Sequence, residues 1–320
     1  MTLSLLQIIN AVQGELGLPI ATTVIGNSDL TTTQMFYLAN RVIDMMRRMH
    51  ETGWSAMMEG YNIVVNPPLL TTGDTTINSP IITNIPSTTG LEAQYWAVSG
   101  NQLPQAARIL SVDSISQVTL DMEATGTETS GSLIFAKDTY PYPSDYDFTQ
   151  NRTQWDRTNR WELLGPDSAQ MDQWHRSGIV ATGPRRHFRK IGPLANRWRI
   201  WPQPAEIASP LQLVFEYLSI NGVAVNGDLN TRAQYFANDA DQPLLDDQAV
   251  ITGIKWKFWE IKGFNFASMK NDWCDYIDTL IARDEGAATL QLAKQMNPIF
   301  ISPSSVQNGF FPGPVGPSSS

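Results

Sequence analysis

The stretch that decides the fold is Gly60-Tyr61-Asn62-Ile63-Val64-Val65-Asn66-Pro67-Pro68, where a strand pattern replaces two helical patterns. Its apolar and β-branched residues favour an extended strand that ends at the two prolines. On its N-terminal side, apolar residues recur at three-to-four spacing over residues 2–16 and 34–52, which predicts two amphipathic helices. We expect Thr2 to cap the first helix and Gly53 to end the second.

On its C-terminal side, residues 67–137 contain 19 Ser and Thr, few charges and several short β-type runs separated by turn signals. This composition predicts a small all-β module inserted into a larger β domain. A short helix is expected around residues 168–176. Alternating runs at 197–202 and 211–217 then predict further strands, each with one face exposed to water.

The C-terminal third of the chain returns to helical periodicity. Residues 244–262 and 265–283 predict two helices separated at Gly263. Beyond Gly286, Lys294 is the one charged residue, and five prolines disfavour regular structure, so an extended arm is expected.

The fold class that follows is α+β. N- and C-terminal helices are expected to form a helical bundle, next to a β domain that carries the small all-β insertion and the extended C-terminal arm. The corresponding domain limits are 1–59 with 240–285 for the bundle, 60–66 with 138–239 for the β domain, 67–137 for the insertion and 286–320 for the arm.

The charge of the chain is acidic overall but unevenly distributed. The chain has 320 residues, with 22 Lys and Arg against 31 Asp and Glu, a formal charge of −9. An acidic chain argues against general affinity for nucleic acid. Residues 151–200 nevertheless contain ten basic and four acidic residues, a net +6, which leaves −15 on the remainder. No apolar run approaches the length of about 18 residues that a membrane span needs, so no membrane partner is expected.

Sequence motifs for chemistry are missing, so no enzyme activity, catalytic residue or cofactor is predicted. The phosphate-binding P-loop, Gly-x-Gly-x-x-Gly and Gly-x-Ser-x-Gly do not occur. His50, His175 and His187 have no histidine partner four residues away, which excludes zinc-finger and helical zincin sites. An acidic group could bind a divalent cation, but we favour a helix N-terminus there and predict no metal site; the group is Asp239, Asp241, Asp246 and Asp247.

Two sets of residues are candidates for contacts with other proteins. The basic residues are expected to form salt bridges to neighbouring subunits, with a solvated loop or a phosphate site as alternatives; these residues are Arg157, Arg160, Arg185, Arg186, Arg189 and Lys190. The arm, with Lys294 as its one charged residue, carries apolar anchors suited to insertion into a partner's groove, with a folded-back or disordered tail as the alternative; these are Ile299, Phe300, Ile301, Phe310 and Phe311.

Several short motifs, taken in order, carry a family resemblance. They are Leu5-Leu6-Gln7-Ile8-Ile9-Asn10-Ala11-Val12, Leu38-Ala39-Asn40-Arg41 with Arg47-Arg48 and Trp54, Thr153 to Arg160, Phe215-Glu216-Tyr217 and Phe236 to Asp241. In this order the chain resembles the head-to-tail adaptor proteins of short-tailed bacteriophages, the group that includes tail tubular protein A. The resemblance covers most of the chain outside residues 67–137, and that insertion departs from the family pattern.

The resemblance implies a structural protein of the virion, located at the head-tail interface and assembled in the host cytoplasm. Such adaptors form a homo-oligomeric, twelvefold ring, a dodecamer, between the portal protein and the tail nozzle protein. The arm would bind the portal, and the basic segment would face neighbouring subunits or the tail. Double-stranded DNA would pass through the ring without specific binding, and an acidic lumen would repel its phosphates.

Two other functions are weighed against the adaptor. A tail-associated component that binds or cleaves carbohydrate could use tryptophans as a stacking platform; these are Trp155, Trp161, Trp174, Trp198 and Trp201. A neck protein that contacts DNA could use Arg185 to Lys190, and its binding would then depend on salt.

Overall fold

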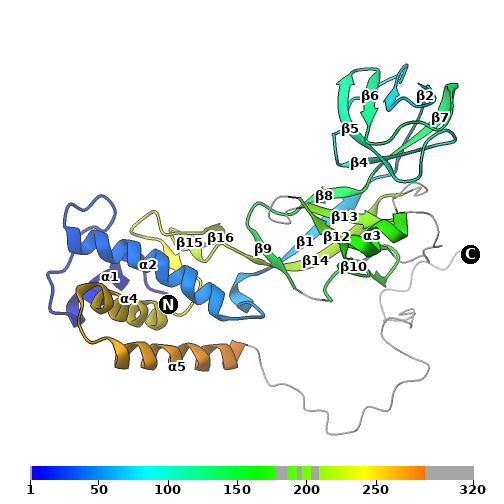
Figure 1. The fold of residues 1–320 in the computed structure, drawn as a ribbon. Helices are drawn as coiled ribbons and strands as arrows, with labels where there is room; N and C mark the ends of the chain where they lie inside the picture. Colours follow the sequence, from blue (N-terminus) through cyan, green and yellow to red (C-terminus); the bar gives the residue numbers. More distant parts are fainter. Residues whose placement is uncertain (1, 151, 177–185, 193–196, 203–208, 285–320) are drawn as a thin grey trace, which may run out of the picture. The chain divides into compact units, whose positions relative to one another are not determined.

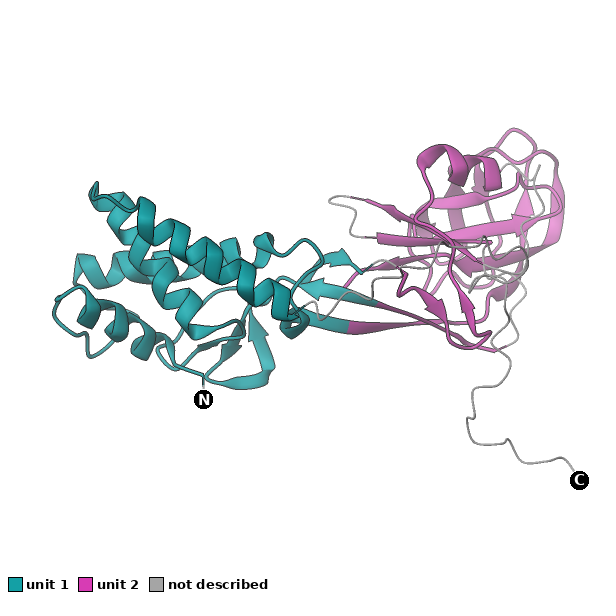
Figure 2. Ribbon diagram, turned by 90° about the horizontal axis from the view of Figure 1, so that it is seen from below, with its two compact units in different colours: residues 1–59, 145–150, 216–295 teal, residues 60–144, 151–215, 296–320 magenta. Residues whose placement is uncertain are grey.

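Figure 1 shows the computed structural model, which describes residues 2–150, 152–176, 186–192, 197–202 and 209–284. These residues form two compact units, coloured separately in Figure 2. Unit 1 consists of residues 1–59, 145–150 and 216–295, and unit 2 of residues 60–144, 151–215 and 296–320. Each unit therefore combines segments that are distant in the sequence.

Helices from both ends of the chain share one core in unit 1. They are α1 (Leu5–Glu15), α2 (Leu30–Met49), α4 (Asp247–Lys262) and α5 (Ala267–Asp284), with a 3-10 turn at Ser55–Met57. α4 packs against α1, α2 and α5. The largest fully buried side chains at this core include Trp256, Met35, Met46, Ile8 and Ile9. Burial of the apolar stripes predicted from sequence is the main driving force for this packing.

Local capping residues fix the ends of these helices. Ser4, rather than the expected Thr2, caps α1 and forms a capping box with Gln7. Asp29 and Asp246 accept backbone N–H bonds at the starts of α2 and α4. Gly263 ends α4 in a left-handed conformation, φ 77°, as the sequence predicts.

Unit 1 also contains strands. β16 (Asp228–Ala233), β15 (Val223–Val225) and β17 (Gln242–Pro243) form a three-stranded antiparallel sheet in that order. Val223 and Leu218 belong to the same apolar core as the helices. β9 (Tyr146–Thr149) pairs with residues 217–219 at the end of β14 (Leu211–Ser219).

The residues predicted as an inserted module form a six-stranded antiparallel sheet in unit 2. Its order is β2-β7-β4-β5-β6-β3, and a bridge between Asp74 and Thr83 joins its two edges into a nearly closed barrel. Phe135, Val98 and Val118 are among its fully buried residues. The strands are β2 (Leu69–Thr75), β3 (Ile81–Ile82), β4 (Trp96–Gly100), β5 (Ala107–Ser114), β6 (Gln117–Leu120) and β7 (Glu128–Lys137).

The rest of unit 2 contains two further antiparallel arrangements and one helix. β12 (His187–Ile191), β13 (Arg197–Trp201) and β8 (Thr139–Pro141) form one sheet, and α3 (Ala169–Arg176) precedes β12. The other has the order β1-β14-β10-β11. Its strands are β1 (Met58–Val65), β14 (Leu211–Ser219), β10 (Trp155–Asp156) and β11 (Trp161–Glu162).

The α+β prediction, a terminal helical bundle beside one β domain, is wrong. The described chain is a mixed, strand-rich structure with several separate antiparallel sheets, one of them nearly barrel-shaped. The terminal helices do not form a bundle of their own, because the sheet of β15 to β17 belongs to the same unit. Those strands have only two to six residues, too few to give a periodic signal in the sequence.

Two further predictions concern the C-terminal arm and membrane-spanning segments. The arm at 286–320 lies outside the described residues. Within the described part of the chain, no helix has the length and apolar character to cross a membrane.

Candidate functional site

The basic run predicted as a contact surface lies in unit 2, at and before β12. Arg185 is outside the described residues, whereas Arg186, Arg189 and Lys190 are half-buried. Arg186 Nη1 donates a hydrogen bond to the carbonyl oxygen of Pro202 at 2.7 Å, and burial lowers the pKa of Arg186. Arg157 and Arg160, between β10 and β11, are exposed.

Arg189 belongs to a buried group of charges that we call the ion cluster: Asp138, Asp172, Arg108, Arg176, Arg189 and Arg199. Asp172, on α3, is 3% exposed and pairs with three guanidinium groups. Arg176 Nε and Arg189 Nη1 each lie 3.0 Å from its carboxylate oxygens, and Arg199 forms the third pair. Asp138 is fully buried and pairs with Arg108 Nη1 at 2.5 Å.

Burial and charge act in opposite directions within the ion cluster. Burial alone would raise the pKa of Asp172, but the guanidinium groups of Arg176 and Arg199 outweigh it and hold that pKa below its ordinary value. Burial, together with the neighbouring Arg176, lowers the pKa of Arg199 to about 10. The cluster therefore fixes α3 against β12 and β13 through shared charges.

Charge counts differ between the two units. Unit 1 contains 10 Lys and Arg against 19 Asp and Glu, so it carries −9, whereas unit 2 contains 12 of each and is neutral. The basic segment 151–200 is balanced by acidic residues of its own unit. The acidic character of the chain thus belongs to unit 1.

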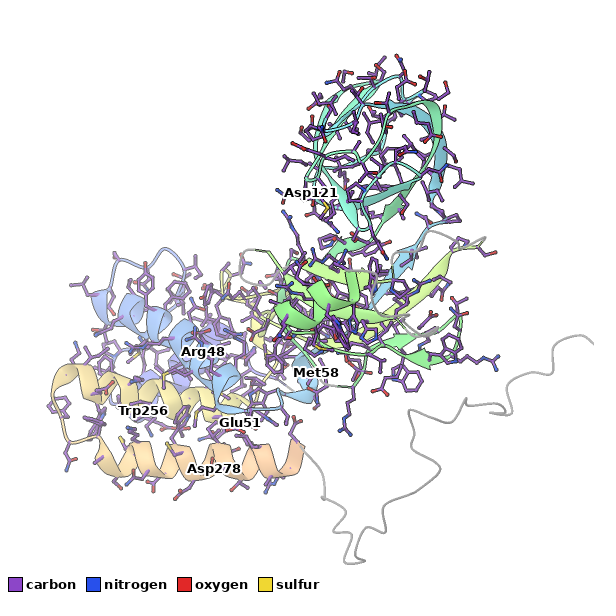
Figure 3. All side chains as sticks on the ribbon, turned by 45° about the vertical axis from the view of Figure 1, so that its right-hand side comes forward. Arg48, Glu51, Met58, Asp121, Trp256 and Asp278 are labelled. Carbon is purple, nitrogen blue, oxygen red and sulfur yellow. The ribbon has the colours of Figure 1, made fainter. Side chains whose placement is uncertain are left out.

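An exposed acidic stripe runs along α5 in unit 1. Asp272, Asp275 and Asp278 are three residues apart and exposed, and none of them forms an ion pair with a described residue. Spacing of three places them on one side of the helix. Figure 3 labels Asp278 on α5 and Trp256 on the neighbouring α4. The opposite side of α5 contributes the buried Trp273 and Ile277 to the core.

The last residue of α5 is fastened to the loop after α2. Asp284 accepts a hydrogen bond from the backbone N–H of Ser55 at 2.8 Å and another from the Ser55 hydroxyl. His50 Nε2 lies 3.5 Å from the same carboxylate. The chain therefore leaves α5 at a fixed point of unit 1. The predicted anchors that follow, Ile299 to Ile301, Phe310 and Phe311, lie outside the described residues.

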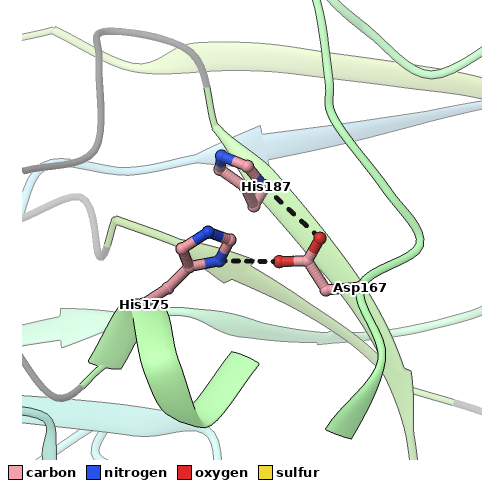
Figure 4. A group of neighbouring side chains, drawn as sticks. All are labelled: Asp167, His175 and His187. Carbon is pink, nitrogen blue, oxygen red and sulfur yellow. Dashed lines mark hydrogen bonds and ion pairs between the residues drawn. The ribbon is translucent and has the colours of Figure 1, made fainter. Parts of the chain in front are cut away.

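Three potential metal ligands meet in unit 2 (Figure 4), and we call them the histidine cluster: Asp167, His175 and His187. His175 Nδ1 lies 3.0 Å from Asp167 Oδ2, and His187 Nδ1 lies 3.4 Å from Asp167 Oδ1. The imidazole ring centroids are 4.2 Å apart. One ligand atom from each residue lies within 4.8 Å of the others.

Backbone pairing explains why these three residues converge. Leu164 forms a parallel bridge with His187, and the Asp167 N–H donates to the Phe188 carbonyl at 2.8 Å. Ser168 then accepts a hydrogen bond from the Met171 N–H and starts α3, which brings His175, eight residues after Asp167, back to the Asp167 carboxylate. The cluster is thus built by the pairing of residues 164–167 with β12.

The acidic group considered as a cation site does not gather around a common point. Asp239 accepts from the backbone N–H groups of Val24 and Ile25, and Asp241 from those of Asn226, Ala237 and Asn238. Asp246 caps α4, as the favoured interpretation expects. Asp247 accepts from the Leu3 N–H, and burial raises its pKa. Hydrogen bonds from backbone N–H groups therefore occupy these four carboxylates.

Sequence reasoning missed the histidine cluster because it searched for ligands at local helical spacing. His175 and His187 are twelve residues apart and lie on different elements. Only the register between Leu164 and His187 makes them neighbours, and no sequence motif marks that register.

The tryptophans considered as a sugar platform do not share one environment. Trp198 and Trp201 are buried, Trp155 and Trp161 are half-buried, and Trp174 is exposed. The indole rings of Trp198 and Trp201 are therefore used in packing, where Trp198 contacts Phe188 and Phe215 edge-on.

Comparison with known proteins gives the chain no family. No protein-family model matches it, and no curated protein matches it.

Proposed function

We propose that this chain is a non-enzymatic structural adaptor of a phage virion, which forms a ring between portal and tail nozzle and continues the DNA channel. The observation that carries the proposal is the acidic stripe of α5, Asp272, Asp275 and Asp278, which unit 1 exposes without cationic partners among the described residues. A stripe of this kind, repeated around a ring, lines a channel that repels DNA phosphates.

The distribution of charge between the units supports the same function. Unit 1 carries the whole −9 of the chain, whereas the arginines of unit 2 are balanced within that unit. A protein that bound DNA tightly would be expected to carry a net excess of cations instead. A chain with one acidic and one neutral unit suits a passage through which DNA moves without adhering.

The fixed end of α5 supports the role of the arm. Asp284 is held by Ser55, so the proline-rich segment that follows, in which Glu285 and Lys294 are the charged residues, starts from a defined place on unit 1. Anchors such as Phe310 and Phe311 on such a segment suit insertion into a partner's groove.

The first experiment tests ring formation and portal attachment. Purified full-length protein, alone and with portal protein, is imaged by negative stain, and rings are expected. Deleting residues 298–320 should leave the circular dichroism spectrum unchanged and abolish attachment to the portal. A protein that stays monomeric at every concentration with portal present would contradict the adaptor function, and unchanged attachment would contradict the role of the arm.

The second experiment tests the stripe. The double variant Asp275→Lys/Asp278→Lys adds four positive charges per chain on α5, and the control Glu92→Lys/Glu123→Lys adds the same charge on exposed positions of unit 2. At low salt, rings of the α5 variant should retain double-stranded DNA in a gel shift, whereas wild type and control should not. Equal retention by both variants would show that total charge, not the position of the stripe, governs DNA passage.

A further inference from the structure

We propose that Asp167, His175 and His187 bind one divalent transition-metal ion of the zinc class, and that this ion cross-links α3 to β12 within unit 2 (Figure 4). The inference does not depend on the adaptor function. It rests on the geometry of the three side chains, on their burial and on the charge of Asp167.

The distances in the histidine cluster match the edges of a coordination shell. Zn²⁺ binds imidazole nitrogen and carboxylate oxygen at about 2.0–2.2 Å, so neighbouring ligand atoms of a tetrahedral ion lie roughly 3.3 Å apart. The two Nδ1-to-oxygen separations, each to a different oxygen of Asp167, are 3.0 and 3.4 Å. Small side-chain rotations would place all three groups around one ion, because one ligand atom from each already lies within 4.8 Å of the others.

The charge of Asp167 distinguishes a metal site from a hydrogen-bonded cluster. Its side chain is only 12% exposed, and among the described residues it pairs with the two imidazoles and with no guanidinium or ammonium group. The nearby arginines 176, 189 and 199 are paired with Asp172 instead. A carboxylate removed from water without a cationic partner is costly, and a bound cation removes that cost.

The two rings are close enough to share one ion, since their centroids are 4.2 Å apart. A single bound metal ion would compensate the charge of the Asp167 carboxylate. His175 is 6% exposed, so its ring is held in place by packing before any ion binds.

The ligand set selects the class of ion. Two imidazoles and one carboxylate suit Zn²⁺ and its first-row neighbours. Ca²⁺ requires six to eight oxygen ligands and Mg²⁺ prefers oxygen and water, so both should bind weakly here. Three protein ligands leave a position for water, and His187, at 18% side-chain exposure, gives the ion a way in.

A bound ion would stabilise unit 2. The ligands come from the segment before α3, the end of α3 and the start of β12, and the ion would close the 21-residue segment from Asp167 to His187. Because these ligands converge only in the folded unit, zinc binding should raise its melting temperature with zinc concentration.

The experiment uses the full-length, untagged chain, since a polyhistidine tag would itself bind zinc. The protein is treated with chelator, dialysed and titrated calorimetrically with ZnCl₂. One ion per chain is expected, and affinity should fall as pH is lowered because protons compete for imidazole nitrogens. Substitution of Zn²⁺ by Co²⁺ should give visible absorption bands typical of nitrogen and oxygen ligands.

The variants distinguish the loss of a metal ligand from the loss of the folded structure. His175→Gln and His187→Gln should each weaken zinc binding by at least about tenfold and abolish the rise in melting temperature. Asp167→Asn keeps an acceptor oxygen and should also weaken binding, which guards against a His variant that fails to fold. His50→Gln is the matched control, because His50 is the third histidine of the chain and lies in unit 1. Binding that is absent from wild type, or equal in all variants, would overturn the proposal.

Discussion

In unit 1, the fully buried Asp241 accepts hydrogen bonds from the backbone N–H groups of Asn226, Ala237 and Asn238. In unit 2, the similarly buried Asp138 and Asp172 face guanidinium groups instead. Both arrangements satisfy the carboxylate oxygens, but only the second adds a positive charge for each negative one. The way each unit solvates its buried carboxylates is thus one origin of their different net charges.

Sharing of charges shows the same contrast. Arg47, in unit 1, is shared by two carboxylates, those of Asp44 and Asp147. Asp172, in unit 2, is shared by three guanidinium groups. Unit 1 therefore keeps an excess of negative charge that it can expose, while four arginines of unit 2 pair with the buried carboxylates of Asp138 and Asp172.

The largest expected effect comes from Asp172→Asn. The substitution leaves Arg176, Arg189 and Arg199 without their shared negative charge, and Arg176 and Arg199 are largely buried. Breaking a buried ion pair by removing one partner typically costs about 3–5 kcal/mol. Urea denaturation followed by circular dichroism measures the loss, since urea does not screen charges.

The control for that variant is Asp278→Asn on the exposed side of α5, which should change the free energy of unfolding by less than about 0.5 kcal/mol. A loss below about 1 kcal/mol in Asp172→Asn would mean that the guanidinium groups find other partners. The two units would then differ in which groups contact their buried carboxylates, but not in how much those contacts stabilise the fold.

A smaller loss is expected from Asp241→Asn in unit 1. The amide keeps one acceptor oxygen but turns an N–H group toward backbone donors, at a cost of about 2–3 kcal/mol at pH 7. Burial raises the pKa of Asp241, but the N–H bonds from Ala237, Asn226 and Asn238 outweigh it and hold that pKa below its ordinary value. This stabilisation is therefore present above the unfolded pKa, about 3.9, and is lost as pH falls through the lower folded pKa.

The measurement for Asp241 is the free energy of unfolding of wild type and variant from pH 7 down to pH 3. The difference between them should shrink only at the acidic end. A difference that stays constant with pH would show that the carboxylate charge contributes nothing, and that packing alone explains the loss.

Gly253→Ala tests the packing of the apolar core in unit 1. Gly253 lies within α4, and a Cβ there would meet Val42 Cγ1 at 2.6 Å and Trp273 Nε1 at 3.0 Å. Overpacking costs about 1–3 kcal/mol, of which the better helix propensity of Ala returns up to about 1 kcal/mol. A net loss of about 1–2 kcal/mol is expected in thermal or urea unfolding.

Gly14→Ala is the matched control, because Gly14 lies on the exposed side of α1 and a Cβ there meets nothing within 4 Å. It should stabilise the chain by about 0.5–1 kcal/mol. Stabilisation by both substitutions would mean that α2 and α4 can separate enough to admit a methyl group.

The sequence predicts the helices well and the sheets only in part. Ile8, Met35 and Trp273 lie on apolar stripes long enough to show helical period, and each is buried as predicted. The α+β bundle was wrong because β15 to β17 are short and pack on those helices through tertiary contacts. Local patterns contain no information on which helix a two-residue strand will meet.

The candidate sites likewise depend on tertiary contacts that local sequence patterns do not show. The basic composition of residues 151–200 can be counted in the sequence, but the pairing of Arg189 with Asp172 depends on the fold. The histidine cluster depends on one backbone bridge between Leu164 and His187. The domain limits, the contact residues and the adaptor function stay predictions.

The smallest expected effect concerns the acidic stripe itself. Asp275 lies three residues from both Asp272 and Asp278, so Asp275→Asn removes like-charge repulsion on the surface of α5. Stability should rise by about 0.2–0.5 kcal/mol at low ionic strength, because Asn and Asp have similar helix propensities. At 1 M salt, where the screening length is about 3 Å, the gain should vanish. Thermal unfolding at the two salt concentrations measures it. A loss of stability at low salt would mean that the stripe has cationic neighbours after all, and that unit 1, like unit 2, neutralises its acids within its own surface.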